Sequence, residues 1–437
     1  MSKSASIRNW LTSTKIIGMS LGLTNTYKII KKLKLNVKDS KIIHVAGSNG
    51  KGTVCALMAT TLTMMKKSNL LFSSPHLCKV EERIRINGKP CDSIIFDGAL
   101  MNIKSAANEE NIQLTFFETT FLAALIVAKQ SKVEYLILET GLGGRLDATR
   151  CTNADLAILT AISKEHSDIL GDDIYQIIAE KAAIARPGKP IIAREMPIFN
   201  YRKTVKEIAH NCQQVILEEE SLPAICHFVK VPGNTSINVE AKLLVQNAFN
   251  FLNLSTKKID CALKNLHWPG RLQKLTLHNG QTLILDAAHN PSGLAKVSNE
   301  LISLIQPEIK NKKWSLIFGT SPQKEMDEMV ESITEICRKL GPPELYLTKP
   351  QGGRYPGVET EDLANYPWSY SKIYQFENVK QVLDYIIKKQ TLQNQPILSI
   401  GSLYLQGNIL NYLQLNTDND LSLIPKKSNA TPSRRVD

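Results

Sequence analysis

The chain has 437 residues, of which 43% are hydrophobic and 22% are charged, and 53 basic against 41 acidic side chains give a net charge of +12. This length exceeds one ordinary hydrophobic core, so about two or three domains are expected. No apolar run approaches the roughly 20 residues of a membrane span, and the opening residues MSKSA lack the apolar core of a signal peptide. The composition therefore argues against a membrane protein and predicts a soluble, cytoplasmic one.

The charge and the cysteines set further bounds. A net charge of +12 is compatible with nucleic acid, a membrane surface or an anionic small substrate. Lysines are spread along the chain, which favours a compositional bias on solvated faces, so neither nucleic acid nor membrane is predicted as a partner. The eight cysteines show no Cys-x-x-Cys pair and no zinc spacing with histidines, and we interpret them as reduced, mostly buried thiols.

The first strong motif is an apolar strand at 41–46 that runs into GSNGKGT at 47–53. Its glycines permit backbone conformations in which successive N–H groups point at phosphate oxygens, while Lys51 reaches the terminal phosphates and Thr53 offers a hydroxyl to Mg²⁺. A helix expected from Val54 to about Lys66 adds its positive dipole end. Gly52 separates Lys51 from Thr53, which departs from the common G-x-x-x-x-G-K-[ST] form. The alternative is a Gly-rich turn without a ligand, but the flanking strand and helix favour a nucleotide site.

Strand-like and helical segments then alternate along the chain. Strands are expected at 134–138, 155–160 and 190–193, and helices at 115–129 and 172–186. Such alternation predicts a mainly parallel sheet flanked by helices, with ligands gathered beyond the carboxyl ends of the strands.

A second alternating series follows HWPG at 267–270. It comprises expected strands at 283–285, 314–319, 344–347 and 396–400, and expected helices near 293–305, 323–340 and 379–388. The predicted fold class is α/β: a P-loop ATPase domain over residues 1–268 that also binds the acceptor, then a smaller Rossmann-like domain over 269–415. Residues 416–437, which end in a Ser-, Pro- and Arg-containing stretch, are expected to be a disordered tail.

Further motifs follow in order, and each is weak alone. They are SSPHL at 73–77, ERIRING at 82–88, TFFE at 115–118, LETGLGGRLDAT at 138–149, His166, EKAA at 180–183, PGR at 269–271, DAAHNP at 286–291 and GSLYL at 401–405. Glu139 stands at a strand end before three glycines, which suits a metal ligand beside bound phosphates, although a lone Glu there is more often structural.

In this order the set resembles the folylpolyglutamate synthase and dihydrofolate synthase family, the folate-directed branch of the Mur ligases. The resemblance covers nearly the whole chain, from Gly22 to about Leu413, and includes the glycine inserted between Lys51 and Thr53. It implies an ADP-forming acid–amino-acid ligase that uses ATP and Mg²⁺. Such enzymes add L-glutamate to dihydropteroate, to the γ-carboxyl of tetrahydrofolates, or to both, by way of an acyl phosphate. We favour both activities in a monomer.

The resemblance also assigns roles in the first domain. The phosphates would lie against Gly47, Asn49, Gly50, Lys51 and Gly52. Thr53 and Glu139 would hold one Mg²⁺ and His166 a second, with Ser74 close by. Lys181 matches a lysine that is carbamylated in the family; the alternative is an ordinary solvated lysine. Phe117 and Glu118 fall in the pteridine-side segment, although a core pair of phenylalanines is nearly as plausible.

In the second domain, Arg271 would contact phosphate, Asp286 and Asn290 would meet the ribose or base, and His289 and Ser402 would lie towards the incoming glutamate. His289 would also suit the base that deprotonates the amine, with a structural histidine as an equal competitor.

Some positions depart from the family signatures. Thr53 stands for Ser, Glu165 for Asp, Ala287 for Gly and Arg150 for Asn, and none of these removes a proposed ligand. The stretch Gln323-Lys324-Glu325 replaces Asp-Lys-Asp, which puts any role there in doubt.

Two other functions compete with this interpretation. A peptidoglycan-precursor ligase would need a further N-terminal domain for its uridine nucleotide, whereas only about 40 residues precede the first strand here. A catalytically inactive, nucleotide-binding relative is disfavoured because Lys51, Thr53, Glu139 and His166 are intact.

Overall fold

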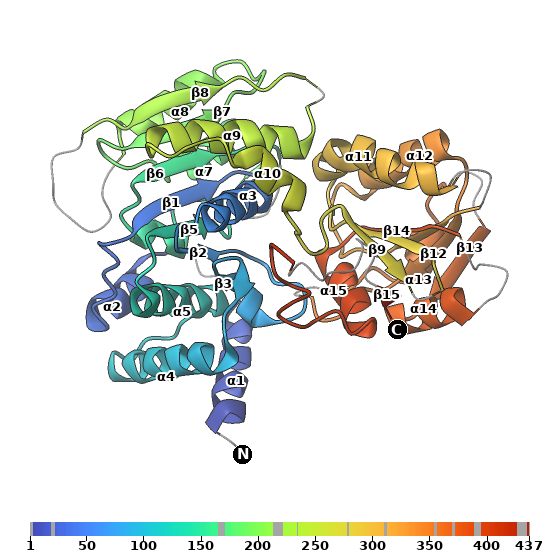
Figure 1. The fold of residues 1–437 in the computed structure, drawn as a ribbon, viewed down its shortest axis with the longest axis horizontal. Coiled ribbons are helices and arrows are strands. Elements are labelled where there is room, and N and C mark those ends of the chain that lie inside the picture. The colour runs from blue at the N-terminus through green and yellow to red at the C-terminus, as the bar shows by residue number, and fades with distance from the viewer. Residues whose placement is uncertain are drawn as a thin grey trace. The chain divides into compact units, whose positions relative to one another are not determined.

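The computed structural model describes residues 3–18, 22–164, 171–212, 222–233, 235–277, 279–309, 313–353, 356–368, 372–388, 395–425 and 435–436. The chain divides into two compact units. Unit 1 comprises Met1–His76 and Glu81–Leu266, and unit 2 comprises Leu77–Val80 and His267–Asp437. The division after Leu266 lies close to the expected one after residue 268. Each unit is an α/β structure built on its own sheet (Figure 1).

Unit 1 contains an eight-stranded sheet in the order β4-β3-β2-β5-β1-β6-β7-β8. Strands β2, β5, β1, β6, β7 and β8 are parallel, and β3 and β4 add an antiparallel edge. The strands are β1 (Lys41–Ala46), β2 (Asn69–Phe72), β3 (Ile84–Ile86), β4 (Lys89–Pro90), β5 (Tyr135–Glu139), β6 (Leu156–Leu159), β7 (Pro190–Arg194) and β8 (Ile225–Val229).

The helices of unit 1 pack in groups against this sheet: α3 with α9 and α10, α4 with α5, and α7 with α8 (Figure 1). The helices are α1 (Lys3–Ser13), η1 (Thr14–Ile17), α2 (Thr24–Lys32), α3 (Lys51–Met64), η2 (Val80–Arg83), α4 (Ser93–Glu109), α5 (Phe116–Ser131), η3 (Ala148–Cys151), α7 (Ile174–Ala182), α8 (Tyr201–His210), α9 (Ile237–Phe251) and α10 (Ile259–Asn265). None of the helices in the described ranges is both long and apolar enough to cross a membrane.

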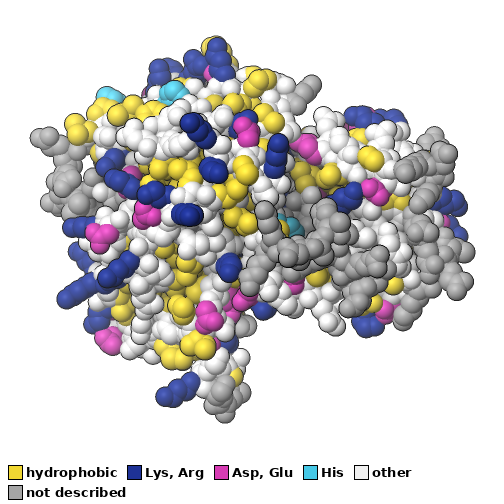
Figure 2. Space-filling model, in the orientation of Figure 1, with side chains coloured by type: hydrophobic (Ala, Val, Ile, Leu, Met, Phe, Trp, Pro, Cys, Tyr) yellow, Lys and Arg dark blue, Asp and Glu magenta, His cyan; other side chains and the backbone are white. Residues whose placement is uncertain are grey.

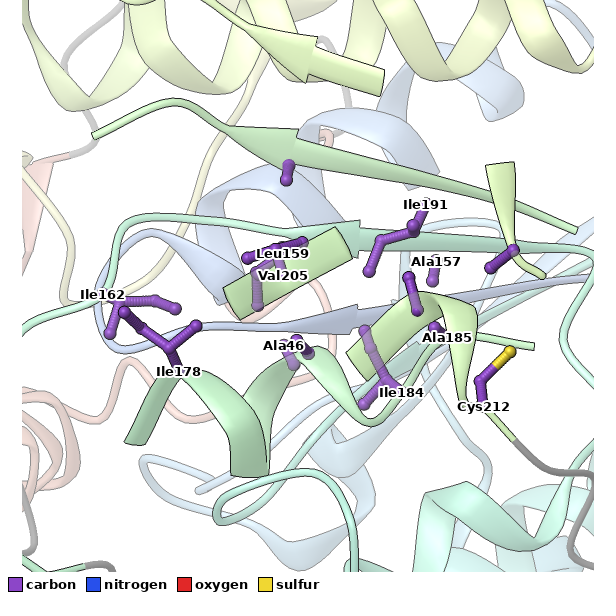
Figure 3. Close-up of a cluster of buried hydrophobic side chains, with 14 of the residues drawn as sticks. Ala46, Ala157, Leu159, Ile162, Ile178, Ile184, Ala185, Ile191, Val205 and Cys212 are labelled. Atoms are coloured by element: carbon purple, nitrogen blue, oxygen red, sulfur yellow. The ribbon is translucent and has the colours of Figure 1, made fainter. Parts of the chain in front are cut away.

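The central strands are buried along almost their whole length. Ile43, Val45 and Ala46 of β1 have no exposed surface, as expected for parallel strands covered on both faces. On one side, Ala46 and Leu159 at the ends of β1 and β6 pack with Ile178 of α7 and Val205 of α8 (Figure 3). This core fixes the carboxyl ends of the strands, where the predicted site residues lie.

Helix α3 is buried over most of its surface. Ten consecutive residues from Thr53 to Leu62 are buried, and its neighbours include α9 and α10 as well as β1, β2 and β5. A helix that is apolar all round belongs in the interior of a domain. The segment that starts directly after the Gly-rich loop is therefore held from every side.

Unit 2 contains a seven-stranded sheet in the order β13-β12-β11-β14-β10-β9-β15. Among the described strands, β9 and β10 form the antiparallel pair, β15 runs parallel to β9, and the remaining pairs are parallel. Its strands are β9 (Gln273–Leu277), β10 (Thr282–Leu285), β11 (Ser315–Phe318), β12 (Glu344–Thr348), β13 (Lys372–Phe376), β14 (Ile397–Ile400) and β15 (Arg435–Val436). Its helices are α11 (Pro291–Ile309), α12 (Met326–Leu340), α13 (Thr360–Ala364), α14 (Val379–Lys388) and α15 (Leu403–Tyr412).

The expected disordered tail from residue 416 needs correction. Leu421 and Leu423 have no exposed surface, and the main-chain N–H of His267 donates to the carbonyl of Leu423 over 2.7 Å. The two leucines supply apolar surface that folding removes from water, so residues 416–425 belong to the packed unit 2. Further on, Arg435–Val436 pairs with β9.

Helix α5 begins with a capping box that includes Glu118, a residue predicted from the sequence to lie at the substrate site. Thr115 Oγ1 accepts a hydrogen bond from the N–H of Glu118, and Glu118 Oε2 accepts one from the N–H of Thr115 over 2.8 Å. The other oxygen of Glu118 accepts the hydroxyl of Thr26 over 2.9 Å, and the side chain is buried. The structure thus gives Glu118 a structural role in joining α5 to α2.

Replacing Glu118 by Ala removes one half of the capping box and leaves two buried donors, the N–H of Thr115 and the hydroxyl of Thr26, without their acceptor. We expect the free energy of unfolding to fall by about 1–3 kcal/mol, measured as a lower denaturation midpoint. Turnover per folded molecule should change little. Glu118→Gln, which retains an acceptor oxygen, should lose less stability. Unchanged stability with strongly impaired acceptor binding would instead restore the substrate role predicted from the sequence.

Candidate active site

The Gly-rich loop joins β1 directly to α3. Gly47 adopts φ +143°, and a Cβ at this position would lie 2.0 Å from Thr160 Oγ1, so only glycine fits. Gly50 adopts φ +89° at the N-cap position of α3. The helix begins at Lys51, earlier than the predicted Val54, so Gly52 and Thr53 belong to its first turn. The extra glycine thus lies in the helix turn whose free N–H groups would suit an anion.

The segment after β6 holds this loop in place. The N–H of Ser48 donates to the carbonyl of Ala161 over 2.8 Å, and Thr160 Oγ1 donates to the carbonyl of Asn49 over 2.8 Å. Ser48 Oγ donates to the carbonyl of Ser163 over 3.0 Å, and the Asn49 amide donates to Ser163 Oγ over 3.2 Å. The loop shape is therefore set by the fold itself.

Two lysines meet at this loop. Lys51 Nζ donates to the carbonyls of Gly47 and Ser48 over 2.7 and 3.0 Å, and Lys181 Nζ, from the last turn of α7, donates to Gly47 over 3.2 Å. Lys181 is only 2% exposed, which excludes the alternative given in the sequence analysis, that it is an ordinary solvated lysine. Both ammonium groups thus lie on one carbonyl oxygen beside the predicted phosphate position.

Glu139 ends β5, the strand next to β1. Its side chain is buried, and Oε2 accepts the main-chain N–H of Ser74 over 3.1 Å. Thr53 is also buried, in the first turn of α3. The structure thus brings Glu139 and Ser74 together, at the sheet edge that also carries the Gly-rich loop.

The second glycine-rich segment is anchored by a residue to which the sequence analysis gave no role. Asp147 Oδ2 accepts the N–H groups of Gly141 and Leu142 over 2.9 and 3.0 Å, and Oδ1 accepts the N–H of Thr149 over 3.0 Å. Burial raises the pKa of Asp147, whereas these hydrogen bonds lower it. The signal available in the sequence was an Asp two residues before a Thr, which is a local capping pattern.

His44 extends this network and was also missed. Its Nε2 lies 2.7 Å from Thr149 Oγ1 and 3.0 Å from Thr140 Oγ1, inside the sheet. Complete burial, and then the charges of Arg186 and Arg150, hold the pKa of His44 well below its usual range. His44 is thus a neutral ring that joins β1 to the two segments around the site.

Phe117, predicted to contact the pteridine, packs beside the same segment. Its ring centroid lies 5.6 Å from that of Phe72, and a Cβ on Gly141 would lie 2.5 Å from its Cε2 atom. The ring is partly exposed, so one part of it packs in the core while another part remains accessible.

The predicted residues of unit 2 gather at the carboxyl end of β10. Asp286 is buried and accepts the N–H groups of Leu272 and Ala288 over 2.9 and 2.8 Å. Burial raises its pKa, while the nearby Arg271 lowers it. His289 Nδ1 lies 2.9 Å from the carbonyl of Ala287.

The side chains of two more of these residues accept hydrogen bonds from main-chain N–H groups at the beginning of helices. Asn290 Oδ1 accepts the N–H of Gly293 in the first turn of α11 over 2.7 Å, and Ser402 Oγ accepts the N–H of Tyr404 as the N-cap of α15. Ser402 follows β14, the neighbour of β10, so it lies at the same sheet edge. The stretch 323–325 precedes α12, and Gln323 Nε2 contacts the sulfur of Met329.

His166 lies outside the described residues. Among the described ones, no group of three or more His, Cys, Asp or Glu side chains is placed to hold a metal ion. Two of the predicted metal ligands, Thr53 and Ser74, are hydroxyl groups. Together with the Glu139 carboxylate they form a set of hard oxygen donors, which suits Mg²⁺.

A strand–Gly-rich loop–helix unit with converging lysines is the arrangement of a phosphate-binding site. The profile of the Mur ligase middle domain matches residues 45–221, which makes the class that of the ATP-dependent Mur-type ligases. The dihydrofolate synthase/folylpolyglutamate synthase of Escherichia coli is 31% identical over 65% of this chain and 69% of its own length. That of Bacillus subtilis is 27% identical over 92% of this chain and 97% of its own length. The chain belongs to the dihydrofolate synthase/folylpolyglutamate synthase family.

The solved structures agree with this assignment. A bifunctional folylpolyglutamate synthase/dihydrofolate synthase from Yersinia pestis, complexed with AMPPNP and Mn ion, superposes with a TM-score of 0.77 at 27% identity, covering 93% of this chain and 98% of its own. The predicted α/β fold and the predicted enzyme class, an ATP-dependent acid–amino-acid ligase, are confirmed.

Replacing Gly47 by Ala places a Cβ against Thr160 in a backbone conformation that strains any L-residue, at about 1–3 kcal/mol. We expect ADP to bind at least about tenfold more weakly, measured by calorimetry. Gly98→Ala in α4, where an added Cβ meets nothing within 4 Å, is the matched control and should bind normally. Normal affinity in the Gly47 variant would contradict the role of the loop.

Proposed function

We propose that this chain joins L-glutamate both to dihydropteroate and to the γ-carboxyl of tetrahydrofolates, in one active centre. The observation that carries the proposal is the convergence of the Gly-rich loop, Lys51, Lys181 and Glu139 at the carboxyl ends of the neighbouring strands β1 and β5. The names of its relatives support both acceptors.

The chemistry explains why these groups are needed. A carboxylate is a poor electrophile, so its oxygen attacks the γ-phosphorus of ATP, which releases ADP and leaves an acyl phosphate. The amine of glutamate then attacks the acyl carbon, the amide forms, and phosphate leaves with the C–O bonding pair while the amine loses a proton. The loop N–H groups and the Lys51 ammonium would stabilise the negative charge on the transferring phosphate.

The oxygen donors beside the loop suit a divalent cation. Thr53 and Glu139 would hold one Mg²⁺ near the phosphates, with Ser74 next to Glu139, and His166 would serve a second ion. When bound, such an ion would neutralise charge on the phosphate oxygens. Gly47, Asn49, Gly50 and Gly52 would hold the phosphates in this assignment.

Lys181 is proposed to carry a carbamate. Its neutral amine would attack CO₂, forming an N–C bond and releasing a proton to water, so that a cation becomes an anion. The position of Lys181 supports the change, because its ammonium lies beside that of Lys51 on the Gly47 carbonyl, and like charges at short range disfavour the charged form of an amine. A carbamate there would instead attract Lys51 or a metal-bound water.

In unit 2, Arg271 and Asp286 are proposed to serve the nucleotide together with Asn290, and His289 and Ser402 the incoming glutamate. Their common position at the ends of β10 and β14 supports a shared ligand edge. Phe117 would pack on the pteridine. We further propose a cytoplasmic monomer acting on small molecules; its eight cysteines are free thiols, which suits a reducing compartment.

The proposal is tested by turnover of the pure chain with ATP, Mg²⁺ and glutamate, offering dihydropteroate or tetrahydrofolate in parallel. ADP release should require glutamate with either acceptor, and each product should gain one glutamate by mass. Lys51→Ala and Glu139→Ala should remove turnover with both acceptors while the melting temperature stays close to that of the parent, since the strands around them remain packed.

Lys28→Ala is the matched control, because Lys28 is an exposed lysine of α2 and should leave turnover unchanged. Activity with one acceptor alone would restrict the proposal to that acceptor. Glutamate-independent ADP release with both, or full activity of the Lys51 or Glu139 variant, would overturn it.

The carbamate is tested by ¹³C NMR after equilibration with ¹³CO₂. The parent should show a carbamate signal that Lys181→Ala lacks, and turnover of that variant should fall by at least about a hundredfold, the scale typical of one electrostatic group at a reacting phosphate. Lys189→Ala, at a partly exposed lysine directly before β7, should keep both signal and activity. A missing signal in the active parent would exclude the carbamate.

A further inference from the structure

The ring of His44 belongs to a chain of hydrogen bonds inside unit 1, next to the active-site edge of the sheet. Its Nε2 atom lies 2.7 Å from Thr149 Oγ1 and 3.0 Å from Thr140 Oγ1, and all three side chains are buried. The hydroxyl of Thr149 in turn meets the carboxyl of Asp147. Each hydroxyl carries one hydrogen, so the direction of one hydrogen bond determines that of the next.

Asp147 ends this chain as an acceptor. Burial raises its pKa, but the main-chain N–H groups of Gly141, Leu142 and Thr149 donate to its two oxygens and stabilise the ionised form. An ionised carboxylate only accepts hydrogen bonds, so the hydroxyl of Thr149 donates to Asp147 Oδ1. The Thr149 oxygen then offers only lone pairs to His44.

This arrangement determines which nitrogen of His44 carries the hydrogen. Because Thr149 Oγ1 accepts, Nε2 of His44 donates, and Nδ1 keeps a lone pair. Among the described residues, no group hydrogen-bonds to Nδ1. An unpaired buried acceptor is tolerated better than an unpaired buried N–H, so the surroundings of the ring favour the same tautomer. Complete burial holds the pKa of His44 well below its usual range, so the ring is neutral.

The tautomer has a consequence for Thr140, the residue directly after Glu139. A ring N–H offers no lone pair, so Thr140 Oγ1 accepts from His44 and cannot donate to it. Within the described part of the chain, His44 is the one partner of this hydroxyl, which is 2% exposed. The hydroxyl hydrogen of Thr140 is therefore a buried donor without an acceptor among the described groups, and buried donors are normally paired.

Thr140 lines a cavity of about 10 Å³ beside the Gly-rich loop. The lining also includes Gly141, Gly143 and both lysines of the site, Lys51 and Lys181. A cavity of this size has room for about one water-sized group, such as a single oxygen atom of a larger molecule. The unpaired donor of Thr140 thus adjoins a space that one acceptor atom fills.

The cavity is electropositive. The ammonium groups of Lys51 and Lys181 both donate to the carbonyl of Gly47, over 2.7 and 3.2 Å. Other Lys and Arg side chains lie scattered over the drawn surface, where water screens their charge (Figure 2), whereas Lys181 lies in the interior. An oxygen with negative charge matches two ammonium groups and a hydroxyl donor.

We propose that Thr140 is a further binding residue of the active site, whose hydroxyl donates a hydrogen bond to an anionic oxygen beside Lys51 and Lys181. His44 is a positioning residue, because its Nε2–H keeps the hydrogen of Thr140 directed away from the ring. The inference rests on the proposed ligase function, which supplies two such oxygens: one of the nucleotide γ-phosphate, and one of a carbamate on Lys181. A hydrogen bond to either is charge-assisted and therefore strong.

Two binding measurements on the full chain separate these sources. Thr140→Val removes the donor and nearly keeps the shape of the side chain. If the oxygen belongs to the γ-phosphate, Thr140→Val should bind AMPPNP with Mg²⁺ about tenfold or more weakly in calorimetric titrations, and ADP as the parent does. If it belongs to a carbamate, the ¹³C carbamate signal of Thr140→Val should need about tenfold or more ¹³CO₂ for half-saturation.

Thr60→Val is the matched control. Thr60 is a fully buried threonine of α3, and its hydroxyl has no hydrogen-bond partner in the described ranges. The control should leave both measurements unchanged. Thr140→Ser, which keeps a hydroxyl, should lie closer to the parent than Thr140→Val does.

The positioning role is tested by ¹⁵N NMR of the histidine-labelled parent at neutral pH. The ring of His44, assigned by its through-space contacts to Thr140 and Thr149, should carry hydrogen on Nε2 and none on Nδ1. Hydrogen on Nδ1 would overturn the inference, and so would equal AMPPNP affinity together with equal carbamate formation in Thr140→Val and parent. If the parent shows no carbamate signal, the AMPPNP comparison alone decides. None of these measurements requires turnover, so a failed glutamate assay would overturn the proposed function by itself.

Discussion

The contact between Gly47 and Thr160 is the constraint on which the active site depends. Because the missing Cβ of Gly47 leaves room for the Thr160 side chain, the loop after β1 lies directly on the segment after β6. Hydrogen bonds join the loop residues Ser48 and Asn49 to Thr160 and to residues 161–163. The carbonyl of Gly47 is then turned towards Lys51 and Lys181. A single small residue therefore determines where two cations meet.

Much of the fold was predictable, because buried parallel strands are uniformly apolar and punctuated by polar loops. The strand at 41–46 and the helix at 379–388 agree with β1 and α14 in their bounds. Short or partly exposed elements, such as β13 and β8, carry a weaker pattern and were missed. The ordered segment 416–425 was missed because the two leucines that anchor it are isolated in a polar stretch.

Motifs singled out the candidate site residues where chemistry dictates the residue type, whereas contacts that depend on packing could not be predicted. Lys51, Glu139 and Lys181 lie near the carboxyl ends of β1 and β5, and their roles stay predictions. Glu118 and Ser402 also stand in motifs, yet their side chains cap helices, which sequence spacing alone does not separate from ligand contact. His44 reads as one polar residue in an apolar strand, and its partners Thr140 and Thr149 are distant in sequence, so their contact follows only from the fold.

Helix α3 is buried from Thr53 to Leu62, whereas its first two residues, Lys51 and Gly52, are partly exposed. Because the packed body of the helix fixes the position of this accessible end, little conformational entropy would be lost when a phosphate binds there. The fold thus holds the main-chain N–H groups of this end in place before a nucleotide arrives.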